Sequence, residues 1–129
     1  MNSNITTVAV GESVASYSHG KIVNGLLFTS GMTSHDLVTG EVRGETIAEQ
    51  TRYSFELLEQ VLALAGSDLT DLLQVQVFLA DIDADFAEFD ETYREIVPVP
   101  YPPRATVGAV LPGYKIEMLI TANANGAEA

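Results

Sequence analysis

The sequence predicts an α+β domain of two layers, in which two helices pack on one face of a mixed β-sheet. Short runs of alternating or apolar residues are typical of strands, and two segments with apolar residues at three- and four-residue spacing are typical of helices. Turn residues separate these segments. In chain order the elements are β-β-β-α-β-α-β-β. Because the chain has 129 residues and no internal repeat or low-complexity linker, we expect one domain over residues 1–129.

The first three elements are predicted to be strands. Residues 1–13 predict an early strand centred on residues 5–10. Residues 21–30 contain two apolar runs that meet at Asn24-Gly25, a dipeptide that strongly favours a β-hairpin. Residues 33–44 are rich in turn-forming residues and predict a surface loop.

Residues 46–65 form the clearest predicted helix, and Gly66 is the expected C-terminal stop. Its apolar residues recur on one side: Ile47, Phe55, Leu58, Val61, Leu62 and Ala65. After a turn, residues 73–79 alternate in polarity, which predicts a strand with Val75, Val77 and Leu79 on one face.

A second helix is predicted to begin at Asp83 or Asp85 as its N-cap. Its buried stripe is expected to contain Phe86, Phe89, Tyr93 and either Ile96 or Val97. Four prolines between residues 98 and 103 end this helix and predict an extended segment. Residues 104–110 and 115–122 are expected to be two strands of one hairpin, turning at Pro112-Gly113, and residues 123–129 a disordered polar tail.

Two helices can cover only one face of the predicted sheet. The other face, which carries Gln74, Gln76 and Phe78, is neither clearly polar nor clearly apolar. This mixed face favours an oligomer.

The composition excludes several classes of function. Six Lys and Arg against 18 Asp and Glu give a net charge of −12, which argues against a nucleic-acid partner because such binding depends on basic residues. No apolar run approaches the roughly 18 residues that span a bilayer, and residues 1–7 lack the features of a secretory signal. The absence of cysteine excludes disulfides and thiolate chemistry, so we expect a cytoplasmic protein without a membrane partner.

Metal and nucleophile motifs are weak in this chain. The only histidines, His19 and His35, lie in predicted loops without metal-ligand spacing and are interpreted as surface residues. Ser30-Gly31 lacks the Gly-x-Ser-x-Gly context of a serine nucleophile. A glycine-rich phosphate loop is also absent from the sequence.

Arg104 and Glu117 are the residues whose positions most need a reason. Arg43, Arg52 and Arg94 have acidic or polar neighbours and are interpreted as surface charges, whereas Arg104 follows a proline pair and leads into an apolar strand. Glu117 lies between apolar residues in mid-strand, which costs free energy unless the carboxylate is paired or functional. The pattern alone favours a cross-strand ion pair or a solvated strand edge. The functional alternative is a guanidinium that binds a substrate carboxylate and a carboxylate that activates water.

Several motifs, taken in order, resemble the Rid (reactive-intermediate deaminase, YjgF-like) family across nearly the whole chain. They are Ser30-Gly31, Thr39-Gly40-Glu41, the helix of residues 50–66, Val77-Phe78-Leu79, Asp85-Phe86-Ala87 before Thr92-Tyr93, Pro103-Arg104-Ala-Thr-Val-Gly and Lys115-Ile-Glu117. The resemblance implies a chorismate-mutase-like fold and a homotrimer with ligand clefts between subunits. It also implies hydrolysis of 2-aminoacrylate-type enamines and imines to 2-oxo acids and ammonia, without a metal or organic cofactor.

The resemblance also assigns roles to individual residues. Arg104 matches the arginine that holds the substrate carboxylate, and Glu117 matches the glutamate that directs the hydrolytic water. Tyr17 matches a tyrosine near the cleft mouth, and Gly31 a glycine whose backbone lines the site. The full set of substrate-binding residues expected beside the two catalytic ones is Tyr17, Ser30, Gly31, Asp90 and Thr106.

Four departures from the family pattern leave the substrate open. Asp90 stands where the family has an asparagine, Thr106 where it commonly has a cysteine, and Ser18-His19 where Ser-Gln is usual. The segment between Arg104 and Glu117 is also about two residues shorter, an even change that preserves the face of Glu117. A branch that acts on aminomuconate- or aminoacrylate-type catabolic intermediates therefore stays open. So do a non-catalytic module that binds small carboxylates and a structural or chaperone-like interaction protein.

Overall fold

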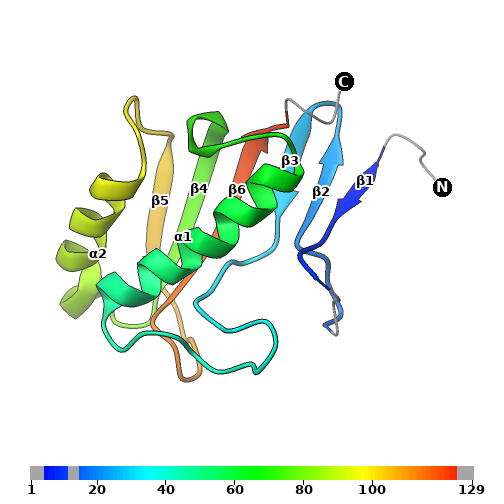
Figure 1. The fold of residues 1–129 in the computed structure, drawn as a ribbon. Helices are drawn as coiled ribbons and strands as arrows, with labels where there is room; N and C mark the ends of the chain where they lie inside the picture. Colours follow the sequence, from blue (N-terminus) through cyan, green and yellow to red (C-terminus); the bar gives the residue numbers. More distant parts are fainter. Residues whose placement is uncertain (1–4, 12–14, 125–129) are drawn as a thin grey trace.

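Two helices lie on one face of a six-stranded sheet in the computed structural model, which describes residues 5–11 and 15–124 (Figure 1). The elements are β1 (Thr6–Val8), β2 (Gly20–Val23), β3 (Leu26–Thr29), α1 (Ile47–Leu64), η1 (Leu69–Asp71), β4 (Leu72–Leu79), α2 (Ile82–Ile96), β5 (Arg104–Gly108) and β6 (Ile116–Asn123). The strand order across the sheet is β1-β2-β3-β6-β4-β5. β4 and β5 are parallel and the other neighbours antiparallel, so the predicted α+β class, element order and mixed sheet are confirmed.

The predicted hairpin is formed by β2 and β3. Asn24 and Gly25 connect the strands with positive φ angles of 51° and 75°. Two such residues in succession give the tight turn whose twist matches that of paired strands, and an Asn-Gly dipeptide adopts it at little cost. β1 extends this hairpin on its outer edge; residues 1–4 and 12–13 of the predicted first strand lie outside the described residues.

α1 begins and ends where the sequence predicts. Thr46 is its N-cap: the Thr46 side chain accepts a hydrogen bond from Glu49 N, and the Glu49 side chain accepts one from Thr46 N. This reciprocal capping satisfies two backbone donors that the helix itself cannot. Gly66, with φ 70°, follows the last turn, and the predicted apolar stripe is buried.

α2 begins earlier than predicted. Asp81, rather than Asp83 or Asp85, is the N-cap, and its Oδ1 accepts a hydrogen bond 3.3 Å long from Ala84 N. Asp83 and Asp85 instead lie in the first turn, where negative charge complements the helix dipole. Several acidic residues close together therefore left the position of the cap ambiguous in the sequence.

The final two strands do not form a hairpin, contrary to expectation. β4 lies between them, parallel to β5 and antiparallel to β6. Arg104 is in register with Val75, and Glu117 with Phe78. Since side chains alternate along a strand, Arg104 points to the face that carries the helices and Glu117 to the other face.

The C-terminal strand also extends further than expected. Asn123 belongs to β6 and is in register with Leu26. Ala124 is fully buried, and its N–H donates a 2.8 Å hydrogen bond to Gly25 O. The predicted disordered tail is therefore wrong for residues 123 and 124; residues 125–129 lie outside the described residues.

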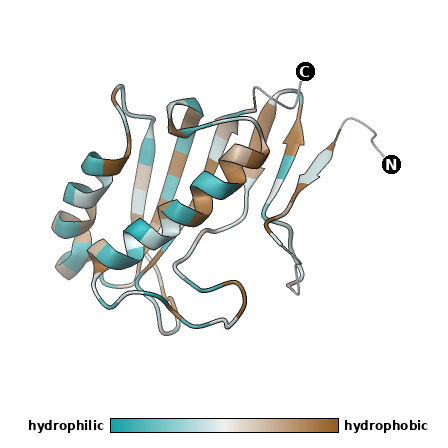
Figure 2. Ribbon diagram, viewed as in Figure 1, coloured by the Kyte–Doolittle hydropathy of each residue, from teal (hydrophilic) through white to brown (hydrophobic). Residues whose placement is uncertain are grey.

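The core lies between the helices and the sheet. Buried apolar side chains of α1 and α2 meet those of the central strands, and both helices carry hydrophilic as well as hydrophobic residues (Figure 2). The largest completely buried side chains are Phe55, Phe89, Leu27, Met32, Leu58, Leu62, Leu79, Ile116, Met118 and Ile120. Neither helix in the described part of the chain is long and apolar enough to cross a membrane.

The opposite face of the sheet has no helix over it. Here Phe28 and Val107 expose 45% and 48% of their surface, between the polar side chains of Gln74, Gln76 and Thr121. The mixed character predicted for this face is therefore present, and it includes large apolar side chains in contact with solvent.

Candidate functional site

Arg104 lies at the start of β5, underneath α2. Its guanidinium carbon is 4.6 Å from the ring centroid of Tyr93, 5.3 Å from that of Phe89 and 5.8 Å from that of Phe86. A guanidinium at these distances is attracted by the electron-rich faces of aromatic rings. The aromatic stripe of α2 therefore holds the planar end of Arg104 in place.

Asp90 binds two arginines, Arg94 of its own helix α2 and Arg104 of β5. Nη1 of Arg104 donates a 2.9 Å hydrogen bond to Asp90 Oδ1, and Nη2 of Arg94, one helical turn further along, donates a 2.7 Å bond to Oδ2. Partial burial opposes ionisation of Asp90, but the hydrogen bond and charge of Arg104, with the charge of Arg94, outweigh it. The pKa of Asp90 therefore lies below its usual value, and this carboxyl is ionised at neutral pH.

These contacts overturn one interpretation made from the sequence. The partner of Arg104 in the chain is Asp90, and an ion pair with Glu117 within the chain is ruled out because the two residues point to opposite faces. Arg94 is an exposed surface charge, as expected, and it also binds Asp90. The four-residue spacing of Asp90 and Arg94 on a predicted helix was the signal that could have identified this pair.

A pocket of about 340 Å³ opens beside these charges. We name it the arginine pocket; its lining residues are Asp90, Tyr93, Arg94, Tyr101, Pro102 and Arg104. The hydroxyl of Tyr93 is buried and has no hydrogen-bond partner among the described residues. Burial raises the pKa of Tyr93, although the charge of Arg104 opposes this, so the hydroxyl remains a proton donor.

Thr106 has a second buried hydroxyl without a partner among the described residues. It is two residues after Arg104 on β5 and in register with Val77, so its side chain leaves the same face of the sheet as that of Arg104. Buried polar atoms in folded proteins are nearly always hydrogen-bonded. The two unsatisfied hydroxyls of Tyr93 and Thr106 are therefore available to a ligand on this side of the sheet.

Glu117 belongs to a separate group on the open face. A Cβ atom added to Gly31 would lie 2.5 Å from Oε2, 2.6 Å from Cδ and 2.7 Å from Cγ of Glu117. Only glycine allows the Glu117 side chain to lie this close to the backbone, because any other residue would displace it. Next to Gly31, the Oγ of Ser30 is buried and has no partner in the described residues.

Tyr114 is the hydrogen-bond partner of Glu117. Its hydroxyl donates to Glu117 Oε1 at 3.0 Å, and its ring contacts that of His35 edge-on, with 4.9 Å between centroids. Burial, the hydrogen bond to Glu117, the charge of Glu117 and the proximity of Tyr17 together raise the pKa of Tyr114 to about 12. Sequence reasoning missed Tyr114 and Tyr101, since neither belongs to a motif that distinguishes it from an ordinary core or surface tyrosine. It placed Tyr93 in the buried stripe of the second helix and in a family motif, but did not assign it to the site.

The backbone of His19 contacts Ser30 of the group around Glu117. Its carbonyl accepts a 3.0 Å hydrogen bond from Ser30 N, and its Nδ1 accepts one from Val10 N at 2.8 Å. Burial lowers the pKa of His19, so its ring is neutral around pH 7. Among residues 5–11 and 15–124, no group of three or more His, Cys, Asp or Glu is arranged to hold a metal ion.

The structure thus divides the expected site residues into two half-sites on opposite faces of the sheet. The arginine half-site contains Arg104 and Asp90, with Thr106 on the same face. The glutamate half-site contains Gly31, Ser30 and Glu117, with Tyr17 close enough to affect Tyr114. A single chain therefore does not place the expected carboxylate clamp and the expected water-directing group in one cleft.

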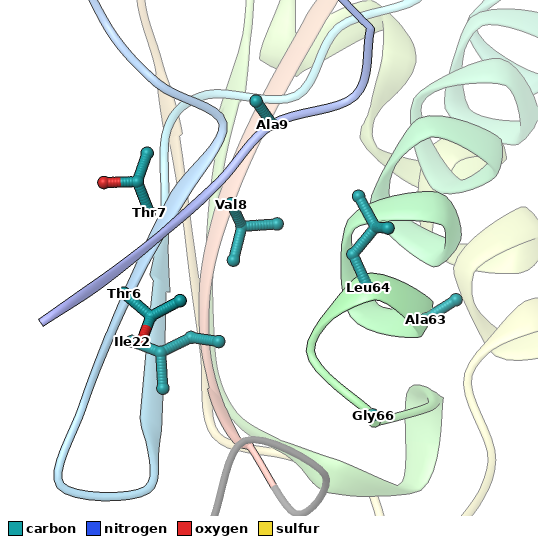
Figure 3. Close-up of a pocket in the computed structure, with 8 residues that line it drawn as sticks. All are labelled: Thr6, Thr7, Val8, Ala9, Ile22, Ala63, Leu64 and Gly66. Atoms are coloured by element: carbon teal, nitrogen blue, oxygen red, sulfur yellow. The ribbon is translucent and has the colours of Figure 1, made fainter.

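Another hollow, of about 470 Å³, lies between β1 and the C-terminal end of α1 (Figure 3). Val8 and Ile22 are on its strand side, and Ala63 and Leu64 on its helix side (Figure 3). Among the described residues, its lining carries threonine hydroxyls as side-chain polar groups and no side chain that could serve as an acid, a base or a charged anchor. This hollow is not a candidate active site.

Comparison with known proteins gives consistent matches over nearly the full chain. The family model described as Endoribonuclease L-PSP matches residues 7–124. Protein mmf2, mitochondrial, of Schizosaccharomyces pombe is 44% identical over 93 residues, which cover 72% of this chain and 71% of that protein. The human 2-iminobutanoate/2-iminopropanoate deaminase is 28% identical over 116 residues, covering 88% and 84%. The crystal structure of a YjgF family member from Neisseria meningitidis superimposes with a TM-score of 0.80 at 34% identity, covering 92% and 93%.

Proposed function

Because the chain belongs to the YjgF/Rid family, which the endoribonuclease L-PSP model describes, we propose that it deaminates reactive enamines and imines. Its substrates are of the 2-aminoacrylate type, and its products are 2-oxo acids and ammonia. The observation that carries this proposal is that the fixed guanidinium of Arg104 lines the arginine pocket together with Tyr93, whose buried hydroxyl has no hydrogen-bond partner among the described residues. The name of the human relative, an imine deaminase, supports it.

Arg104 serves as the clamp for the substrate carboxylate. Asp90 accepts from Nη1, and no protein acceptor contacts Nη2 or Nε within the described part of the chain. A planar guanidinium with a free edge binds a carboxylate through two parallel hydrogen bonds. Because the aromatic rings and Asp90 already fix its orientation, little side-chain entropy is lost when the substrate binds.

Glu117 directs the hydrolytic water. The water oxygen attacks C2 of the protonated imine while one of its protons passes to the Glu117 carboxylate, giving a neutral carbinolamine. Glu117 returns this proton to the nitrogen. As the C–N bond breaks, Glu117 takes the proton of the carbinolamine hydroxyl, so that the C2 carbonyl forms, and passes this proton to the departing ammonia, which leaves as ammonium. An imine carbon is already electrophilic, so orientation and proton transfer are the main contributions required of the protein.

The two half-sites meet only if a second copy of the chain supplies one of them. We propose a homotrimer, in which the arginine half-site of one chain faces the glutamate half-site of the next. A ring of identical chains repeats such a head-to-tail contact and closes on itself. The exposed Phe28 and Val107 on the open face of the sheet support burial of that face against a neighbouring chain.

Asp90 supports a branch with an altered substrate preference. Its carboxylate occupies one edge of Arg104 and is held by Arg94, so the three side chains together carry one net positive charge. Only one edge of the Arg104 guanidinium, that of Nη2 and Nε, remains for a substrate carboxylate. Aminomuconate- or aminoacrylate-type catabolic intermediates with a single carboxylate near the reacting carbon are the alternative substrates that fit this arrangement.

Although the family model is described as an endoribonuclease, the composition of this chain argues against RNA as a substrate. RNA backbones are neutralised by Lys and Arg, and this chain has six such residues against 18 acidic ones. Cytoplasm remains the predicted location. The mitochondrial location in the name of protein mmf2 of Schizosaccharomyces pombe belongs to that relative.

The proposal is tested by Arg104→Ala with an imine generated in situ by an amino-acid oxidase. Wild type is expected to accelerate release of ammonia and 2-oxo acid, and Arg104→Ala to abolish the acceleration. Arg52→Ala is the matched control, since Arg52 is an exposed residue of α1 that pairs with Glu95 and neither lines the arginine pocket nor contacts Glu117. Turnover at the wild-type rate in Arg104→Ala would contradict the proposed role of Arg104. Binding of 2-oxobutyrate by the wild type without any acceleration would show a carboxylate-binding module instead.

A further inference from the structure

We infer that Tyr114 is the positioning residue of Glu117, and that it holds one carboxylate oxygen so that the other is presented to the water. The inference rests on the proposed function, because it assigns a role within the same hydrolysis. Tyr114 acts through Glu117 and does not itself contact the substrate.

The geometry fixes the hydroxyl of Tyr114 against one oxygen of Glu117. Tyr114 lies in the turn before β6, three residues before Glu117, and donates to Oε1 at 3.0 Å. Its ring cannot swing away freely, because the ring of His35 packs against it edge-on at an interplanar angle of 76°. His35 is in turn held by Thr33, whose Oγ1 lies 2.7 Å from His35 Nδ1.

Gly31 limits the carboxylate on its other side. The point where a Cβ of Gly31 would lie is 2.5 Å from Oε2, so this second oxygen passes directly over the Gly31 backbone. Glu117 is therefore confined between a hydroxyl and a glycine, with a different neighbour for each oxygen. A carboxylate held in this way keeps one oxygen for the protein and one for a bound water.

Tyr114 is the donor in this contact whenever the Glu117 carboxyl is ionised. An ionised carboxylate has no hydrogen to donate, and the pKa of about 12 keeps the Tyr114 hydroxyl protonated at neutral pH. The titratable groups that face the hydroxyl or its ring are Glu117, His35 and Tyr17. Because Tyr114 does not titrate in the working range, it is an anchor for Glu117 and not a proton relay.

Tyr114→Phe separates the anchoring role from a purely structural one. The phenyl ring keeps the packing against His35, while the hydrogen bond to Glu117 is lost. We expect kcat to fall by at least about tenfold, because the general base is no longer oriented. KM should stay within about twofold, because Arg104 and Asp90 are untouched. The melting temperature should change little, and Tyr53→Phe, remote from Glu117, should leave all three quantities unchanged.

A second measurement needs no turnover and so distinguishes failure of this inference from failure of the proposed function. In NMR titrations of protein with ¹³Cζ-labelled tyrosine, assigned with Tyr114→Phe, the Tyr114 signal should remain that of the phenol up to about pH 11. In Glu117→Gln it should begin to titrate at lower pH, since the negative charge of Glu117, which raises the pKa of Tyr114, is gone.

Each outcome decides the inference. An unchanged kcat in Tyr114→Phe, or a loss expressed only in KM, would overturn it. An unchanged Tyr114 titration in Glu117→Gln would also overturn it, because the contact would then be absent in solution. If the wild type hydrolyses no imine but Tyr114 still titrates at lower pH in Glu117→Gln, the proposed function fails and the positioning contact stands.

Discussion

Arg104 and Glu117 leave opposite faces of the same sheet, with β4 between their strands. Arg104 is in register with Val75 on the helix-covered face, and Glu117 with Phe78 on the open face. One chain therefore does not bring Arg104 and Glu117 into one cleft. The proposed deamination requires contacts between chains, and each half-site can be tested on its own.

Gly31→Ala is expected to damage activity much more than stability. The added methyl group would collide with the end of the Glu117 side chain, which can rotate away at modest cost but then no longer directs the water. We expect kcat to fall by about 10²-fold, in the range of a displaced general base, while the melting temperature changes little. Steady-state kinetics and thermal unfolding measured on the same preparation check this; an active variant would contradict the assigned closeness of Gly31 to Glu117.

Asp90→Asn is expected to lower the free energy of unfolding at pH 7 by about 1–2 kcal/mol, because two charge-assisted hydrogen bonds lose their acceptor charge. The pKa of Asp90 is lowered in the folded protein, so its contribution is complete above the ordinary value of 3.8. That contribution is lost as the pH falls through the lower pKa of the folded state. The stabilities of wild type and variant should therefore differ at neutral pH and converge in strong acid.

Urea unfolding at several pH values measures this difference. Glu91→Gln is a matched control: it removes the same charge from the same helix, at an exposed position next to Asp90. If Asp90→Asn is as stable as Glu91→Gln at pH 7, the ion pair with Arg104 contributes nothing to the free energy of unfolding.

Thr106→Val tests whether the unsatisfied hydroxyl serves a ligand. The substitution keeps the volume of the side chain and removes a buried polar atom without a partner, so stability should be unchanged or rise by up to about 1 kcal/mol. KM for the imine should rise severalfold if the hydroxyl contacts substrate beside Arg104. Stability that falls together with an unchanged KM would mean that Thr106 has a structural partner and no role in binding.

The parts of the fold that were predictable are those governed by local interactions. α1 combines a capping threonine, a continuous apolar stripe and a terminal glycine, and each of these favours the same helix. The turn at Asn24-Gly25 is similarly determined by two residues that tolerate positive φ. The N-cap of α2 was not determined in this way, because Asp81, Asp83 and Asp85 are chemically equivalent in the sequence.

The arrangement of the site was beyond local reasoning. Strands adjacent in sequence usually pair, and this preference predicted a hairpin of β5 and β6. The long-range insertion of β4 between them changed the neighbours of Arg104 and placed Glu117 on the other face. The contacts of Asp90 with Arg104 and of Tyr114 with Glu117 depend on that placement. The resemblance proposed which residues form the site, and only the structure showed that they lie on two opposite faces of the sheet.

The central claim, a site shared between chains, is tested most directly by mixing two inactive variants. Arg104→Ala retains an intact glutamate half-site, and Glu117→Gln retains an intact arginine half-site. When the two are refolded together in equal amounts, random assembly places an intact Arg104 opposite an intact Glu117 in about one quarter of the clefts of a cyclic oligomer. The measurement is the imine hydrolysis rate of the mixed oligomers relative to wild type. Recovery of about one quarter of the wild-type activity is the predicted result, and no activity above that of the separate variants would contradict the shared site.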